Sequence, residues 1–144
     1  THRGTLFPYT TLFRSLVICD DSIVRGTQLK DNAKLYDEGA GEVHLRIACP
    51  VLLFPCPFLN FSVSRSSLDL AGRTAVFALE GKEDTDYSRY VDENSDHHHA
   101  MVEQIRQRMQ VNSLVYQRMA DLVKAIGLPK EKLCTHCWDN SSTF

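Results

Sequence analysis

The feature that most restricts the fold of this chain is a strand, loop, helix and strand pattern within residues 16–50. Residues 16–19 (Leu-Val-Ile-Cys) form a short apolar run, which is typical of a strand buried on both faces. A helix is predicted over residues 27–38, and Gly39 can take the left-handed conformation that ends a helix. A second strand with alternating apolar residues follows and stops before Pro50. This βαβ unit predicts an α/β fold with a parallel sheet.

Length, composition and charge fit one ordinary globular domain. The chain has 144 residues, of which 43% are hydrophobic, and a net charge of -2. Basic residues do not alternate with aromatic ones in a stripe, so we expect no nucleic-acid partner. No apolar stretch is long enough to span a membrane, and the N-terminus lacks the layout of a signal peptide. Five cysteines, an odd number, fit a reducing compartment, and we therefore expect a cytoplasmic protein without a membrane partner.

The first fifteen residues differ from the remainder of the chain. No period of 2 or 3.6 runs through "THRGTLFPYTTLFRS", whereas a regular strand begins at Leu16. The stretch resembles the translated read-through of a sequencing adaptor. We therefore treat residues 1–15 as a non-native tail and exclude them from predictions of the fold.

Two adjacent aspartates, Asp20 and Asp21, follow the first strand directly. Carboxylates that close repel each other, which suggests a cation or a hydroxyl-rich ligand between them. In doubly wound sheets ligands bind beyond the carboxyl ends of the strands, which is where these residues fall. The backbone amides of residues 22–27 can hold a phosphate, and the carboxylates can accept sugar hydroxyls and help bind Mg²⁺. This combination predicts a ribose 5-phosphate carrying a pyrophosphate. A helix cap is the simpler alternative, but a cap needs one acid, not two.

The segment "VICDDSIVRGTQ" (residues 17–28) resembles the phosphoribosyl-pyrophosphate motif of type I phosphoribosyltransferases, and most closely that of the amidophosphoribosyltransferase family. The similarity continues through "EVHLRIACP", "FPC" and "SLVYQRMADLVKAIGLPKEKLCTHCW", so it covers nearly all of residues 16–138. The resemblance implies a partial type I phosphoribosyltransferase fold, a Rossmann-like parallel sheet with a helical C-terminal extension. It also implies a pentosyltransferase that makes 5-phosphoribosylamine from phosphoribosyl pyrophosphate and glutamine-derived ammonia, the first committed step of purine synthesis.

Roles for individual residues follow from the same resemblance. Asp20 and Asp21 would contact the ribose hydroxyls and magnesium. No general base is evident, so these acids would act by electrostatics and by positioning the sugar. The 5-phosphate loop would consist of Ser22, Ile23, Val24, Arg25, Gly26 and Thr27.

The chain also departs from the family pattern. The family's glutaminase half uses an N-terminal cysteine, whereas this chain starts at Thr1, so glutamine would act through a missing N-terminal glutaminase domain. We expect the fragment alone to be inactive, and the full-length protein to form a homo-oligomer with purine nucleotides as feedback inhibitors. Residues 16–80 would form the C-terminal part of the phosphoribosyltransferase domain, and residues 81–144 a helical extension ending in a CxxC motif. The stretch after "FPC" differs most, but its periodicity predicts a helix over residues 67–80 that stops at Gly81.

Two apolar stripes in the extension are predicted to be core. The segment before the first stripe, residues 82–99, is polar and includes three consecutive histidines. Consecutive histidines on a helix point in different directions, so they do not suggest a metal site. The first stripe is Met101, Val102, Ile105 and Met109, and the second is Met119, Leu122, Val123 and Ile126.

The CxxC motif, Cys134 and Cys137, can ligate one metal centre. A complete site needs four ligands, and the local sequence offers two, or three if His136 turns inward. The resemblance implies a [4Fe–4S] cluster in some family members, with ligands placed like Cys56, Cys134 and Cys137 and one further upstream. Structural zinc and plain buried thiols are the alternatives. Cys19, inside the first strand, is expected to be a small buried hydrophobe.

Three other functions fit parts of the pattern. One is a type I phosphoribosyltransferase that acts on a free base, which the long C-terminal similarity disfavours. The second is a non-catalytic regulator that senses phosphoribosyl pyrophosphate, which its upstream sequence would distinguish. The third is a metal-binding interaction domain built on the CxxC motif, which metal analysis would identify.

Overall fold

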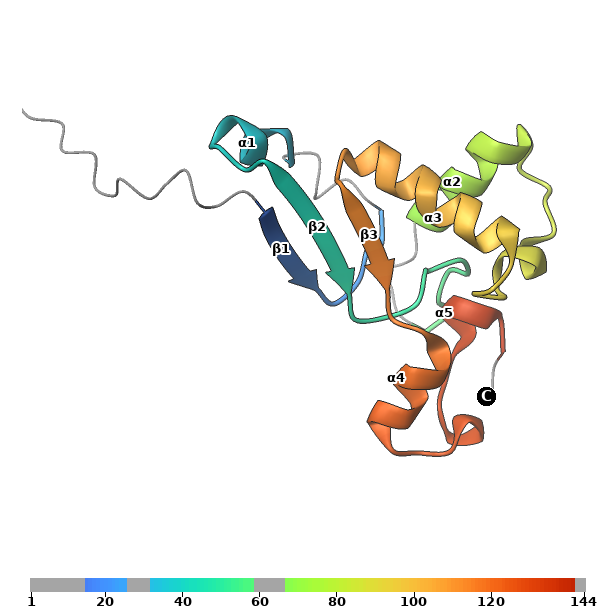
Figure 1. Cartoon of the computed structure of the whole chain (residues 1–144). Coiled ribbons are helices and arrows are strands. Elements are labelled where there is room, and N and C mark those ends of the chain that lie inside the picture. Colours follow the sequence, from blue (N-terminus) through green and yellow to red (C-terminus); the bar gives the residue numbers. More distant parts are fainter. Residues whose placement is uncertain (1–14, 26–31, 59–66, 142–144) are drawn as a thin grey trace, which may run out of the picture.

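The computed structural model describes residues 15–25, 32–58 and 67–141 (Figure 1). Three parallel strands form one sheet in the order β1-β2-β3. The strands are β1 (Ser15–Asp20), β2 (Glu42–Ile47) and β3 (Ser113–Tyr116). The α-helices are α1 (Asn32–Asp37), α2 (Ala71–Glu80), α3 (Asp96–Met109), α4 (Met119–Ile126) and α5 (His136–Asp139). Three short 3-10 helices are η3 (Ser67–Asp69), η4 (Tyr87–Tyr90) and η5 (Lys130–Lys132). The predicted α/β fold with a parallel sheet is confirmed.

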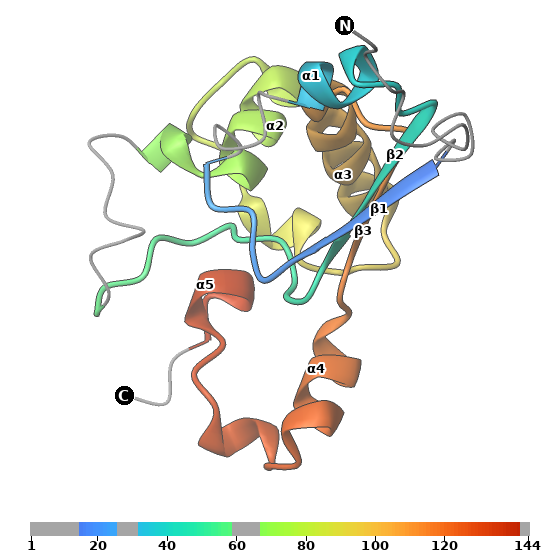
Figure 2. The ribbon, with the colours of Figure 1, turned by 90° about the vertical axis from the view of Figure 1, so that its left-hand side faces the viewer.

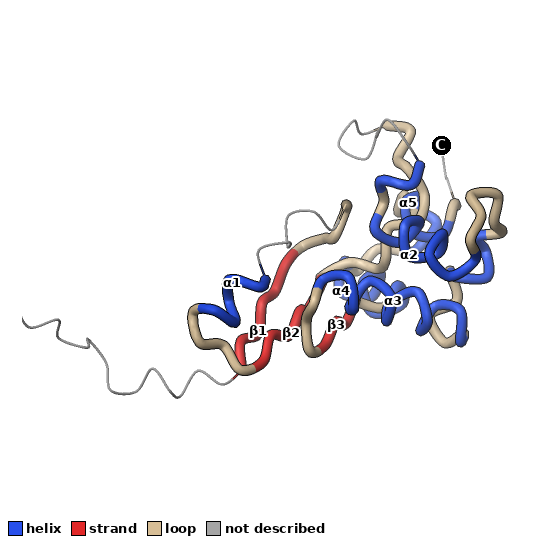
Figure 3. The backbone as a smooth tube through the Cα atoms, turned by 90° about the horizontal axis from the view of Figure 1, so that it is seen from above, coloured by secondary structure: helices blue, strands red, loops and turns tan. Residues whose placement is uncertain are grey.

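The middle strand, β2, carries the centre of the core. Its residues Val43, Leu45 and Ile47 are buried, as their alternation with polar residues predicts. In the register of the sheet, Leu45 lies between Ile18 of β1 and Leu114 of β3. Helices α2 and α3 pack against each other and lie together beside the sheet (Figures 2 and 3). Helix α4 lies beyond the carboxyl ends of the strands (Figure 1).

The prediction that β1 is buried on both faces is wrong. Val17 is 57% exposed, and the thiol-bearing Cys19 is exposed as well. Leu16 and Ile18 point the other way and are half-buried, with Ile18 packed against the core. Val115 of β3, on the same face as Val17, is 50% exposed, so the described helices cover only one face of the sheet. A continuous apolar run is typical of a strand whose sheet is covered on both faces, but here the described residues leave one face uncovered.

The helix predicted over residues 67–80 is present as η3 followed by α2. It ends at Gly81, whose φ of 71° lies in the left-handed region, as predicted. Its periodicity predicts that Ala71, Ala75 and Ala78 face inward. Ala71 and Ala75 are buried, whereas Ala78 is exposed. The helix predicted over residues 27–38 is seen only as α1, because residues 26–31 lie outside the described part.

The two predicted apolar stripes have different outcomes. Met101, Ile105 and Met109 of α3 are buried in the core, as predicted. No residue of α4 is buried, and Ile126 is 48% exposed, so the second stripe is not core. The reason is that α4 leads away from the sheet after β3 rather than back across it (Figure 1).

Strand β3 was not predicted, because its four residues are too few to show a period of 2 between two helices. It pairs with β2, so the segment after residue 80 contributes a strand to the sheet as well as helices. Within the predicted tail, residues 1–14 lie outside the described part, and Ser15 is the first residue of β1. None of the described helices combines the length and apolar character that crossing a membrane requires.

Candidate functional site

The acidic pair lies where β1 ends. Asp20 is the last residue of the strand, Asp21 is the next, and both are exposed. The Asp21 amide donates to the Asp20 carboxylate over 2.9 Å, and the Ser22 hydroxyl donates to the Asp21 carboxylate over 3.2 Å. Both carboxylates therefore keep lone pairs open to solvent at the carboxyl edge of the sheet, where the sequence predicts a ligand.

The loop after the acids is anchored at three points. The Asp20 carbonyl accepts the Ala48 amide over 2.9 Å, just beyond the end of β2. The side chain of Ile23 is 4% exposed and belongs to the core. The Val24 carbonyl accepts the Ala71 amide, the first of α2, over 2.8 Å. The acids are thus carried by a loop whose two ends are fixed to β2 and α2.

The remaining residues of the predicted phosphate loop are only partly described. Ser22 and Val24 are half-buried, and Arg25 is exposed. Gly26 and Thr27 lie outside the described residues. A phosphate cradle formed by the amides of residues 22–27 therefore stays a prediction.

The ends of the other two strands bring two more residues to the same edge. The sequence places Cys49 at a strand end without a definite role, and it does not single out Tyr116. Cys49 follows β2, and burial raises the pKa of its thiol to about 11, with the charges of Asp21 and Asp20 acting in the same direction. Tyr116 ends β3, and burial and the nearby Cys49 raise the pKa of its hydroxyl. That hydroxyl is buried without a hydrogen-bond partner in the described part of the chain. Only their positions after the two strands could have pointed to these residues.

Two of the predicted cysteine segments meet in the structure. The Cys137 carbonyl accepts the amides of Leu53 and Phe54, over 2.9 and 3.0 Å. Burial, and then the neighbouring Cys56 and Cys134, raise the pKa of the Cys137 thiol to about 12. Within the described ranges, no three or more His, Cys, Asp or Glu side chains are arranged to hold a metal ion. The three thiols are neighbours, but they do not form a complete metal site.

His136, which the sequence considers as a third local ligand, lies between the two cysteines of the motif. Its ring centre is 6.4 Å from that of Phe54, with the two planes tilted by 58°. Its Nδ1 atom is buried and has no hydrogen-bond partner among the described residues. The ring therefore packs beside the segment that carries Cys56 and leaves one nitrogen unsatisfied.

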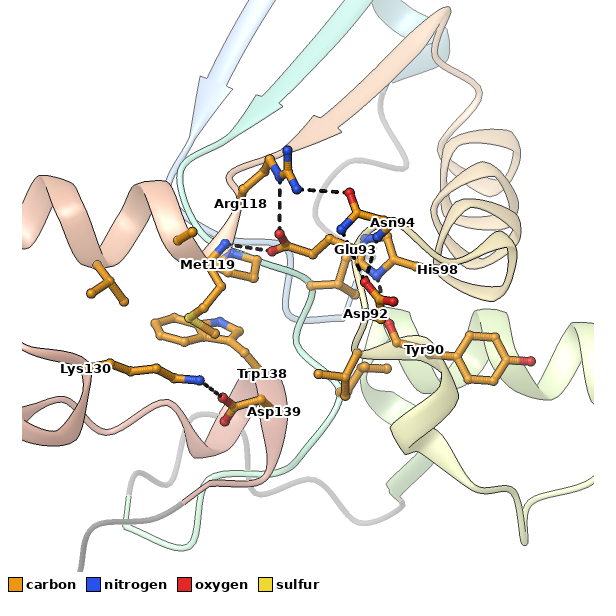
Figure 4. Close-up of a pocket in the computed structure, with 16 residues that line it drawn as sticks. Tyr90, Asp92, Glu93, Asn94, His98, Arg118, Met119, Lys130, Trp138 and Asp139 are labelled. Atoms are coloured by element: carbon orange, nitrogen blue, oxygen red, sulfur yellow. Dashed lines mark hydrogen bonds and ion pairs between the residues drawn. The ribbon is translucent and has the colours of Figure 1, made fainter.

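A cavity of about 590 Å³ lies between the loop after β2 and the C-terminal helices (Figure 4). Four of its charged groups form two ion pairs: Arg118 Nε lies 3.5 Å from the Glu93 carboxylate, and Lys130 Nζ lies 2.8 Å from that of Asp139. Although burial alone would raise the pKa of Asp139, hydrogen bonds from Lys130 and other donors lower it to about 2. Asp92 also lines the cavity, and its carboxylate accepts the Asn94 amide over 3.0 Å.

Comparisons with known proteins give relatives of one kind. No family model matches the chain. It is 32% identical over 127 residues to the amidophosphoribosyltransferase of Methanothermobacter thermautotrophicus, covering 88% of this chain and 21% of that protein. It is 31% identical over 125 residues to the enzyme of that name from Methanocaldococcus jannaschii, covering 86% and 20%. The chain spans about a fifth of the length of the curated relatives it matches.

Two solved structures have the same fold. The structure of the allosteric regulatory enzyme of purine biosynthesis matches with a TM-score of 0.59 and 25% identity, over 87% of this chain and 22% of that one. Glutamine phosphoribosylpyrophosphate amidotransferase from B. subtilis, complexed with ADP and GMP, matches with a TM-score of 0.57 and 24% identity, over 89% and 24%.

Proposed function

Because this chain belongs to the amidophosphoribosyltransferase family, we propose that it supplies the phosphoribosyl-pyrophosphate loop of an enzyme that forms 5-phosphoribosylamine. The observation that carries this function is the exposed pair of carboxylates, Asp20 and Asp21, at the carboxyl edge of the parallel sheet. Their open lone pairs suit the vicinal hydroxyls of a ribose. The anchored loop that follows them suits its 5-phosphate.

The reaction is a displacement at the anomeric carbon of the sugar. The lone pair of ammonia forms a bond to C1 while the bond from C1 to the pyrophosphate oxygen breaks. Pyrophosphate leaves with the bonding electrons, and the new amine loses a proton to solvent. Asp20 and Asp21 hold the ribose through its hydroxyls and stabilise the positive charge that develops on the ring.

Magnesium is the metal expected at this edge, with the carboxylates of Asp20 and Asp21 as its protein ligands. Mg²⁺ commonly takes one or two protein carboxylates and fills its other positions with phosphate oxygens and water. When bound, it neutralises charge on the pyrophosphate leaving group. Within the part of the chain that the structure describes, these two exposed carboxylates have no cationic partner, which fits that ligand set.

Cys56, Cys134 and Cys137 are proposed as three thiolate ligands of a [4Fe–4S] cluster. Their donor chemistry fits, because iron–sulfur clusters are held by cysteine thiolates. The segments that carry them are joined by the bonds from Leu53 and Phe54 to the Cys137 carbonyl. The fourth ligand is expected from another part of the longer enzyme.

Other properties of the longer enzyme are proposed by analogy with its relatives. Glutamine would supply the ammonia through a separate glutaminase domain. Purine nucleotides would act as feedback inhibitors, since the B. subtilis protein is complexed with ADP and GMP. The enzyme would be a homo-oligomer of the cytoplasm.

Calorimetric titration of the chain with phosphoribosyl pyrophosphate, with and without Mg²⁺, tests the proposed binding. We expect saturable binding that needs Mg²⁺ and that weakens at least tenfold in Asp20→Asn and Asp21→Asn. Asp121→Asn, which removes an exposed carboxylate from α4, is the matched control and should bind like the wild type. Equal affinity in all four proteins, or no binding by the wild type, would contradict the proposed function.

A further inference from the structure

We propose that Gly72 is a positioning residue for the loop that carries Asp20 and Asp21. Its missing side chain lets the start of α2 come close enough to the main chain of residues 51–53 to hold that loop. Only the consequence for ligand binding rests on the proposed function. The proposal that α2 fixes the position of the loop depends only on the contacts of Ala71 and Gly72.

The start of α2 and the loop that carries the acids are joined by a backbone hydrogen bond that each of them needs. The first amides of a helix have no partner within the helix and need one from outside. Leu70, at the N-cap, has no polar side chain to offer. The Ala71 amide donates instead to the Val24 carbonyl over 2.8 Å. The loop therefore caps the helix, and the helix in turn fixes the end of the loop, four residues after Asp20.

Gly72 is the residue that permits this arrangement. A Cβ atom there would lie 2.7 Å from the Leu52 carbonyl oxygen, 2.9 Å from Val51 Cγ1 and 3.0 Å from Leu53 Cδ2. Ordinary contact begins at 3.4 Å, so the helix would have to move by about 0.7 Å. The neighbours cannot yield easily, because one is a backbone atom and the other two belong to buried side chains. Glycine is otherwise unfavourable in a helix, and this close approach gives the physical reason for it.

Arg73 also holds the first turn of α2 on this segment. Its Nε donates to the Leu53 carbonyl over 2.6 Å, and its guanidinium lies 4.5 Å from the centre of the Tyr87 ring. The first turn of α2 is therefore held on residues 51–53 by both Gly72 and Arg73. A shift at Gly72 cannot be absorbed by sliding the helix without breaking a neighbouring contact.

Two substitutions test this role by different routes. Gly72→Ala adds the Cβ and displaces the helix. Ala71→Pro removes the amide that binds Val24 but adds nothing at position 72. Proline is favoured at the first position of a helix, and the φ of -70° and ψ of 132° of Leu70 are those preferred before proline. Gly81→Ala is the control. It strains the left-handed end of the same helix, where a Cβ meets no atom within 4 Å.

The heteronuclear ¹⁵N NOE of the amides of residues 21–25 reports the order of the loop without any ligand. We expect this NOE to fall in Gly72→Ala and Ala71→Pro and to stay at the wild-type value in Gly81→Ala. An unchanged NOE in folded Gly72→Ala would overturn the role of Gly72. An unchanged NOE in Ala71→Pro, or an equal fall in Gly81→Ala, would overturn the role of α2, on which that of Gly72 depends. If Gly72→Ala does not fold, Ala71→Pro decides.

Titration with ribose 5-phosphate and Mg²⁺ provides the second measurement. We expect the affinity to fall about fivefold to tenfold in Gly72→Ala and Ala71→Pro, as when one hydrogen bond that orders a site is lost, and not in Gly81→Ala. Wild-type affinity in Ala71→Pro would contradict the positioning of the ligand site. If the wild type does not bind the probe, the proposed function fails, whereas the NOE still decides the role of Gly72.

Discussion

The carbonyl of Cys137 accepts the amide of Leu53 over 2.9 Å, and this bond places the C-terminal CxxC motif beside the segment that carries Cys56. We expect the chain to take up iron and sulfide under anaerobic reconstitution with an excess of a small thiol, because three thiols of the right chemistry are neighbours there and the added thiol can supply the fourth ligand. Serine substitutions of Cys56, Cys134 or Cys137 should each abolish the iron content and the visible absorption of the reconstituted protein.

Cys19→Ser is the control for that experiment, since Cys19 is exposed on β1 and belongs to neither cysteine segment. Uptake of zinc in place of iron would identify the site as structural zinc. Iron uptake that survives the Cys56 substitution would show that this residue is not a ligand.

The charges of Asp20 and Asp21 should matter most in a full-length protein that carries the proposed activity, where the whole reaction can be measured. Changing either residue to Asn keeps the shape and some hydrogen bonding but removes charge that would stabilise the proposed cationic transition state. Pyrophosphate release in the presence of ammonia should fall by about two to three orders of magnitude, as when one preorganised electrostatic contact is lost. The fold should change little, because both groups are exposed. Near-normal pyrophosphate release in both variants would mean that the two acids have no role in the reaction beyond capping a helix.

Tyr90 and Glu80 form a pair whose strength should depend on pH. The buried Tyr90 donates its hydroxyl to the Glu80 carboxylate over 2.6 Å and so connects η4 to the end of α2. Tyr90's hydrogen bond lowers the pKa of Glu80 below its reference value of 4.5. A depressed pKa in the folded state gives stability that is present above pH 4.5 and is lost as the pH falls through the lower folded value.

The stability that the Tyr90–Glu80 pair contributes is also lost at high pH. Burial first, and then the bond to Glu80, raise the pKa of Tyr90 from 10.0 to about 12. This contribution is complete below pH 10 and is lost as the pH rises toward 12. Tyr90→Phe should remove both dependences, as measured by the free energy of unfolding against pH. Tyr90→Ala should cost more, about 3–5 kcal/mol, because it also opens a cavity. Identical pH profiles for the wild type and Tyr90→Phe would refute the pairing.

Substitutions on the two faces of the sheet should change the free energy of unfolding by different amounts. Leu45→Ala removes a fully buried side chain of β2 and should lower the free energy of unfolding by about 2–5 kcal/mol. Val17→Thr changes the open face of β1 and should stay within about 0.5 kcal/mol of the wild type. Urea unfolding of both variants provides the comparison. A large loss in Val17→Thr would mean that the face is covered in solution.

Several parts of this protein can be predicted from local patterns in the sequence. The alternation around Leu45 predicts β2 and its buried face, and Gly81 marks the end of α2. The apolar run ending in Asp20 and Asp21 predicts a strand with its acids at the carboxyl edge, because a strand's direction follows from the βαβ unit. Each of these features depends on residues that are close together in the chain.

Features that depend on contacts between distant segments become visible only in the folded structure. Val17 is exposed because no described helix covers its face of the sheet, and a run of apolar residues contains no information about its neighbours. The four residues of β3 become a strand because β2 offers them hydrogen bonds, which outweigh the lack of a local pattern. The Cys137 carbonyl accepts the amides of Leu53 and Phe54, which brings Cys137 beside Cys56. The Val24 carbonyl likewise accepts the amide of Ala71, from a segment far away in the chain. Contacts of this kind form only when the packed core fixes both partners, so spacing in the sequence cannot predict them.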